Sequence, residues 1–140
     1  MTWISGRLEQ RKKLIDRRNA VANNAENLFG ELWIAIITCT TEAKASGLAV
    51  ETNGTSLERV VAACTPPDPH KRKELRIKLD KYGEKVTVSE SGRETEFLID
   101  VCDDGVICLK LDGKQVTIQD AARLILDPFL FPDLQSENPN

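Results

Sequence analysis

The sequence predicts a single α+β domain with a long N-terminal helical segment, an antiparallel meander of about four to six strands, and a short C-terminal helix packed on the sheet. Two patterns predict this fold: helical spacing of apolar residues near the N-terminus, and alternation of apolar and polar residues over 74–111. A chain of 140 residues can bury a real core as one domain. We expect the domain to span 1–132, and 133–140 to be a disordered tail.

Residues 4–29 are expected to be helical, because apolar residues recur there at near-helical spacing and no Gly or Pro interrupts 7–29. The apolar stripe of the first half is thin, since Arg11 and Arg18 stand where apolar residues would complete it. We therefore interpret residues 1–24 as a helix that projects from the body or packs only on a partner.

The segment 31–45 fits two structures. Its apolar spacing fits a helix, whereas the β-branched run Ile36-Ile37-Thr38 would also suit a buried strand. Its length and the following Gly47 favour a helix. We expect Gly30 to pause the chain between this segment and the first helix.

One hairpin of the meander can be assigned a register. Apolar side chains share a face only if the strands pair 101 with 107, 99 with 109 and 97 with 111. This register leaves Asp103-Asp104-Gly105 as a three-residue loop, with Gly105 where a left-handed glycine is preferred. The hydrophobic pattern and the turn chemistry agree independently on this hairpin.

Other boundaries rest on turn and capping residues. Thr52-Asn53-Gly54-Thr55 indicates a turn, and three prolines between 65 and 69 require a loop. Thr117 followed by Asp120 resembles a capping box that begins the last helix. Pro128 is expected to end that helix.

The four cysteines form no CxxC pair, so they predict no zinc site and are interpreted as reduced. Cys102 and Cys108 belong on one sheet face but not directly opposite each other, so we expect no disulfide between them. Together with Leu98 and Val106 they could pack beneath a helix, which would cover the sheet on both faces. No secretory signal or membrane span is evident, which favours a cytoplasmic protein.

No motif identifies an enzyme, a metal site or a cofactor. The one histidine, His70, lies in the proline-rich loop among cations and is interpreted as solvated. The aspartates at 100, 103, 104 and 112 fail the calcium-loop pattern, because Cys102 and Leu111 occupy ligand positions. These aspartates are better explained by turn chemistry.

Charge is distributed unevenly along the chain. Residues 1–81 hold 14 basic and 10 acidic residues, whereas 82–140 hold 5 and 12. The candidate anion-binding residues are Arg7, Arg11, Lys12, Arg18, Lys71, Arg72 and Lys73. A net charge of −3 and an aromatic content of 5% favour solvated helix faces over a nucleic-acid surface.

Apolar residues that could be exposed indicate a function better than the basic runs do. The candidate interface residues are Trp3, Ile4, Leu8, Phe129 and Phe131. We therefore favour a non-catalytic interaction or assembly module that self-associates or binds a protein partner. The alternatives are a binder of nucleic acid or an anionic surface through the basic helix, and a ligand-binding protein or enzyme with a pocket between helix and sheet.

Overall fold

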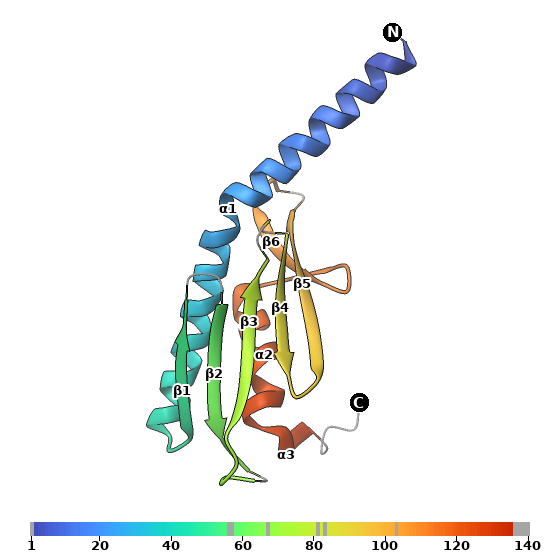
Figure 1. Cartoon of the computed structure of the whole chain (residues 1–140). Coiled ribbons are helices and arrows are strands. Elements are labelled where there is room, and N and C mark those ends of the chain that lie inside the picture. The colour runs from blue at the N-terminus through green and yellow to red at the C-terminus, as the bar shows by residue number, and fades with distance from the viewer. Residues whose placement is uncertain are drawn as a thin grey trace.

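The computed structural model describes residues 2–55, 58–66, 68–80, 82, 84–102 and 104–135. Within these residues the fold is α+β, as predicted: a long helix, an antiparallel sheet and a short C-terminal helix (Figure 1). The elements are α1 (Trp3–Ala45), β1 (Ala49–Gly54), β2 (Glu58–Cys64), β3 (Lys73–Leu79), β4 (Lys85–Glu90), β5 (Arg93–Val101), β6 (Ile107–Leu111), β7 (Lys114–Val116), α2 (Ile118–Leu130) and α3 (Pro132–Gln135).

Helix α1 is one continuous helix of 43 residues. The Thr2 hydroxyl accepts a hydrogen bond from the Ser5 N–H and caps its first turn. The helical interpretation of 31–45 is confirmed, but the pause expected at Gly30 is wrong. Glycine costs a helix interior about 1 kcal/mol, and burial of Phe29 and Leu32 on either side of Gly30 offsets that cost.

The sheet is a meander in which each strand pairs antiparallel with the next, in the order β1 to β7. The seven strands exceed the four to six that were expected. One of the additional strands is β7, which at three residues is too short to show an alternating pattern in the sequence. The turn expected at Thr52–Thr55 is misplaced, since β1 continues to Gly54, which pairs with Arg59. A Cβ on Gly54 would lie 2.4 Å from the Glu58 carbonyl oxygen, so this glycine serves a close strand contact.

The predicted β5–β6 hairpin is confirmed. Val101 pairs with Ile107 and Ile99 with Leu109. The Cys102 N–H donates to the Val106 carbonyl at 2.9 Å, which closes the loop as expected. Gly105 has a φ of +81°, the left-handed value that this turn requires. Position 103 lies outside the described residues.

The core lies on one face of the sheet, beneath the second half of α1 and beneath α2 (Figure 1). Its largest fully buried side chains are Phe97, Phe129, Leu32, Ile36, Leu75, Ile77, Leu109, Val61 and Val86. The expectation that both faces are covered is wrong, because Leu98 and Val106 on the other face are 51% and 60% exposed. Helices α1 and α2 contact each other and lie on one side of the sheet, so neither of them covers the other side.

Helix α2 begins as predicted, with the Thr117 hydroxyl accepting the Asp120 N–H at 3.0 Å. It does not end at Pro128 but continues to Leu130. A proline inside a helix costs about 3 kcal/mol, and complete burial of Phe129 and near-complete burial of Leu130 offset it. Residues 133–135 of the expected tail belong to α3, and 136–140 lie outside the described residues.

A disulfide joins Cys102 and Cys108, which corrects the expectation of reduced cysteines at these positions. The last ladder pair is Val101 with Ile107, and Cys102 follows the end of β5 with its N–H bonded to the Val106 carbonyl. Its Cα lies 6.1 Å from that of Cys108, within bonding range despite the diagonal register. The bond removes the cysteine argument for a reducing compartment. Cys39 and Cys64 are free and half-buried.

We predict that reducing this disulfide lowers the free energy of unfolding by about 2 kcal/mol, because the bond closes a short loop in the unfolded chain. Urea denaturation with and without dithiothreitol measures the difference. A chain carrying Cys102→Ala and Cys108→Ala is the control and should not respond to the reductant. An equal denaturation midpoint for the oxidised and reduced native chain would contradict the prediction.

Candidate functional site

The first half of α1 lies off the body of the protein. Val21 is the first buried residue of the helix, and the side chains before it are exposed or half-exposed. Figure 1 shows this part running away from the sheet to the N-terminus. Residues 3–20, named the arm from here on, extend about 27 Å at 1.5 Å per residue.

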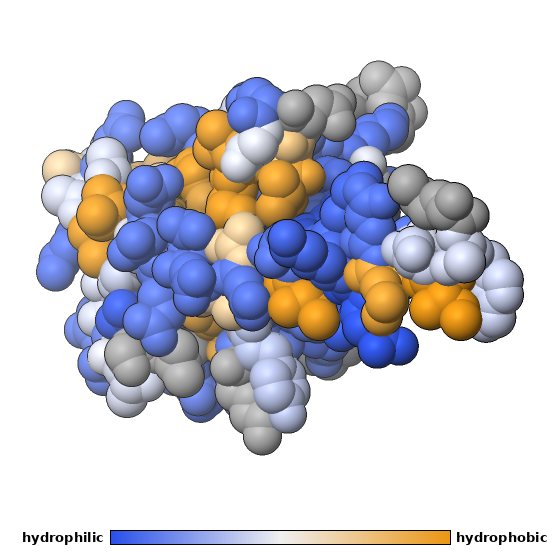
Figure 2. Space-filling model, turned by 90° about the horizontal axis from the view of Figure 1, so that it is seen from above, coloured by the Kyte–Doolittle hydropathy of each residue, from blue (hydrophilic) through white to orange (hydrophobic). Residues whose placement is uncertain are grey.

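The arm exposes five large apolar side chains. Their exposed fractions are 77% for Trp3, 52% for Ile4, 55% for Leu8, 48% for Leu14 and 47% for Ile15. Seen from above, the surface shows hydrophobic residues among strongly hydrophilic ones (Figure 2). Sequence reasoning missed Leu14, although it stands 11 residues, or about three helical turns, after Trp3 and thus on the same side of the helix.

The arm is also basic. Arg7, Arg11, Lys12 and Arg18 are exposed on it, with Lys13 held 3.8 Å from Glu9. Over residues 3–22 the basic residues outnumber the acidic ones by six to two. The structure therefore brings the N-terminal anion-binding candidates together on the arm, interleaved with the exposed apolar residues.

Arg17 attaches the arm to the sheet where the helix leaves the body. Its Nε donates to Asp100 Oδ1 at 2.8 Å, and a second guanidinium nitrogen contacts the same oxygen. Lys110 Nζ lies 3.1 Å from Asp100 Oδ2, and the Val101 N–H donates to Oδ1. The hydrogen bond from Arg17, followed by those from Val101 and Lys110, lowers the pKa of Asp100 to about 2.

This cluster could not be found from the sequence. Arg17 belongs to a basic run, and Asp100 belongs to a group of turn aspartates 83 residues later. Only the packing of α1 across the β5–β6 hairpin brings them together. The Cys102–Cys108 disulfide closes the same end of that hairpin, so the attachment point is covalently braced.

The second basic run lies apart from the arm. Residues 71–73 precede or begin β3, at the end of the sheet away from the N-terminus (Figure 1). Arg72 is within 3.6 Å of Glu51 and 3.8 Å of Glu74. Lys73 donates to the Phe129 carbonyl, and burial lowers the pKa of Lys73. Lys71 is exposed. The two basic runs therefore form no common anion-binding surface.

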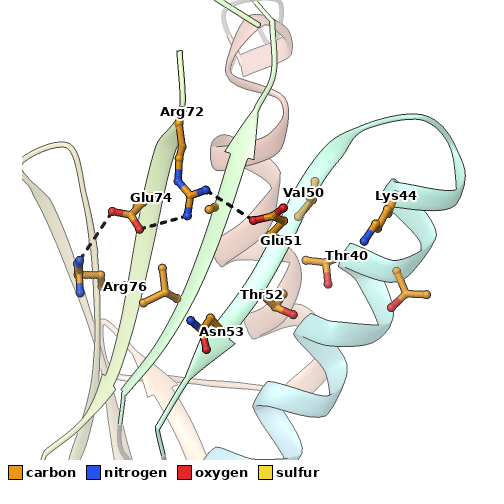
Figure 3. Close-up of a pocket in the computed structure, with 12 residues that line it drawn as sticks. Thr40, Lys44, Val50, Glu51, Thr52, Asn53, Arg72, Glu74 and Arg76 are labelled. Atoms are coloured by element: carbon orange, nitrogen blue, oxygen red, sulfur yellow. Dashed lines mark ion pairs between the residues drawn. The ribbon is translucent and has the colours of Figure 1, made fainter. Parts of the chain in front are cut away.

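A surface pocket of about 600 Å³ lies over β1 and β2, between β3 and the end of α1. Figure 3 shows Arg72 reaching across it between Glu51 and Glu74, while Arg76 also contacts Glu74. These charges neutralise one another rather than converging on an empty centre. Thr40 and Lys44 approach the pocket from α1.

The cavity between α2 and the sheet has a volume of about 240 Å³, which is below the range of roughly 300–1,000 Å³ typical of ligand pockets. Leu32 and Ile36 of α1 are 0% exposed, and Phe97 beneath the helices is 1% exposed. Phe129 is likewise fully buried in this core, so it is not available to a partner. Phe131 is 37% exposed and borders an apolar groove of about 620 Å³ between α1 and α2.

The remaining candidates act as turn or loop residues. Asp104 Oδ1 accepts the Val106 N–H at 3.0 Å, which confirms turn chemistry for this aspartate. Asp112 adopts a φ of +52° in the tight turn before β7. His70 is exposed in its loop, as interpreted from the sequence. Within the described ranges no three His, Cys, Asp or Glu side chains are grouped to hold a metal.

We predict that Asp100 contributes to stability above about pH 4 and that this contribution is lost as the pH falls toward 2. The folded-state pKa is below the usual 3.8, so deprotonation favours the folded state. Denaturation midpoints of the native chain and of Asp100→Asn, measured from pH 2 to pH 6, should converge at the acid end. A difference that is independent of pH would contradict this assignment.

None of the helices described in the structure is both long and apolar enough to span a bilayer. The chain matches no protein-family model, no curated protein and no solved structure. Its function is therefore argued from the arm and its surroundings alone.

Proposed function

We propose that this protein is a non-catalytic assembly module that self-associates through the arm, residues 3–20. The observation that carries the proposal is the exposure of five large apolar side chains on a helix half that its own core does not cover. In proteins most helical stability comes from packing of an apolar face, and the apolar side chains of the arm have no such packing in the body of this chain. A partner surface would stabilise the helix and bury these side chains.

Burial of these side chains would supply a substantial part of the free energy of association. Full burial of one large apolar side chain contributes roughly 1.5–3 kcal/mol. Covering five side chains that are about half exposed would therefore contribute on the order of 5 kcal/mol. Contacts from charged and small residues on the same helix would add to this amount. The attachment at Asp100 supports the proposal, because it already restricts the orientation of the arm. Binding therefore costs less conformational entropy than it would for a freely moving arm.

The alternative is binding of nucleic acid or an anionic surface by the basic arm. Its excess of cations supports this reading. The separation and internal pairing of Arg72 and Lys73 weaken it, because they remove the second half of the basic surface. Trp3 is the arm's one aromatic ring, so base stacking along a strand would be limited. An enzymatic role has less support, since the polar pocket residues pair with one another.

We predict that the full chain is a dimer or larger oligomer and that a chain lacking residues 1–16 is a monomer. Ending the deletion at Asp16 retains Arg17 and its contact with Asp100, so the body keeps its attachment cluster. Size exclusion with light scattering over a range of protein concentrations measures the native mass. Circular dichroism of both chains establishes that the body remains folded.

A matched pair of substitutions separates the arm from apolar exposure in general. Leu8 and Leu98 are 55% and 51% exposed, but Leu98 lies on the open face of the sheet. Leu8→Lys should dissociate the oligomer, whereas Leu98→Lys should leave the native mass unchanged. A full chain that is monomeric at every concentration would overturn the proposed function.

A further inference from the structure

We propose that the partner of α1 is the α1 helix of a second copy, bound antiparallel, so that each arm lies along the second half of the other helix. This inference rests on the proposed function and adds to it the binding surface and its direction. Of the exposed apolar residues of the arm it uses Leu8 and Ile15, because Trp3 and Leu14 lie about 120–140° around the helix from Leu8. It follows from a second set of exposed apolar residues on α1, from small residues between the two sets, and from the distribution of charge along the helix.

The exposed apolar residues of α1 continue beyond the arm. Ile34 is 65% exposed and Ile37 is 37% exposed, although both belong to the half that packs on the sheet. At 3.6 residues per turn, Leu8, Ile15 and Ile37 fall within about 40° of one another around the helix. They form a stripe beside the buried face, named the flank stripe, which is exposed at these three residues. Trp33 lies at the same angle but is half-buried, with the Arg59 guanidinium of β2 5.5 Å from the centre of its ring.

The flank stripe is self-complementary when two copies run in opposite directions. If residue i pairs with residue 45 − i, Leu8 lies opposite Ile37 and Ile15 lies opposite Gly30. Each of the two contacts occurs twice, once on either side of the two-fold axis, as a symmetric dimer requires. The large side chains at 8 and 37 then close the interface toward both ends.

Short side chains line the middle of this pairing. Ala22 and Asn23 are both exposed and face each other across the two-fold axis. A Cβ on Gly30 would meet no other atom within 4 Å, so the space beside this residue is open to a neighbouring side chain. Short residues at these positions let the two helices approach closely enough to pack.

Charge selects the antiparallel direction. Residues 3–22 hold six basic and two acidic residues, whereas 23–45 hold three acidic residues and one basic residue. An antiparallel pair places each basic half beside an acidic half, with Glu26 opposite Asn19 and next to Arg18 of the second copy. A parallel pair would place two strongly basic arms side by side, where like charges are destabilising.

The position of the flank stripe also suits the shape of the helix. Figure 1 shows α1 bending toward the sheet side where the arm leaves the body. The flank stripe is turned about 100° around the helix from the buried face. Two bent helices can therefore stack side by side over their length, with each body attached at an opposite end of the pair.

Cysteine crosslinking tests the arrangement. The starting chain carries Cys39→Ser and Cys64→Ser and keeps the Cys102–Cys108 disulfide. Ala22→Cys should form a disulfide with its own copy under mild oxidation. A mixture of Leu8→Cys and Ile37→Cys chains should give the mixed dimer, whereas Leu8→Cys alone should give none, because its two copies would be about 44 Å apart. Non-reducing electrophoresis with mass spectrometry identifies each product.

Charge substitution provides a second measurement. Glu26→Lys should raise the dissociation constant about tenfold, because it places a cation beside the basic arm of the partner. Glu94→Lys changes the net charge equally on β5 and is the control, expected to leave the constant close to that of the native chain.

The outcomes separate this inference from the proposed function. A dimer by light scattering in which Leu8→Cys crosslinks to itself would overturn the antiparallel arrangement and leave self-association standing. A dimer that gives none of the expected crosslinks, or that responds equally to both charge variants, would also overturn it. A monomeric native chain would overturn the proposed function together with this inference.

Discussion

The packing of the second half of α1 against the sheet is the interaction on which the rest of the structure depends. Leu32 and Ile36 have no exposed surface, and they lie over strands whose own core residues alternate at every second position. Because the sheet is an antiparallel meander, each strand needs only its neighbour and one apolar cover. Two helices on the same face supply that cover and leave the opposite face to charged side chains.

A helix that is continuous from Trp3 to Ala45 transmits this packing to the arm. Packing of the buried half sets the orientation of the helix. The contacts of Arg17 and Lys110 with Asp100 then attach the helix at the edge of the body. The ion pairs alone would contribute little, since Arg17 is largely exposed. Their effect is to direct an arm that is already anchored, and the neighbouring disulfide keeps Asp100 on a braced hairpin.

The open face of the sheet has a different role. Arg72, Arg76 and Lys78 pair with Glu51, Glu58 and Glu74, so the three cations and three anions of this network balance. Such a face stays solvated without attracting a strongly charged partner. The excess of positive charge and the largest group of exposed apolar side chains are instead found on α1, which is why the proposed function is assigned to that helix.

The sequence by itself determined those elements for which the apolar pattern and the turn or capping residues predict the same structure. The β5–β6 register followed from side-chain alternation and from Gly105, and the start of α2 followed from Thr117. The expected Gly30 pause and Pro128 stop were wrong because tertiary burial of Phe29, Leu32, Phe129 and Leu130 outweighs local cost. Tertiary structure alone decided the Cys102–Cys108 bond, the contact of Arg17 with Asp100, and the burial of Phe129. Each of these depends on a distance between residues that spacing along the chain does not specify.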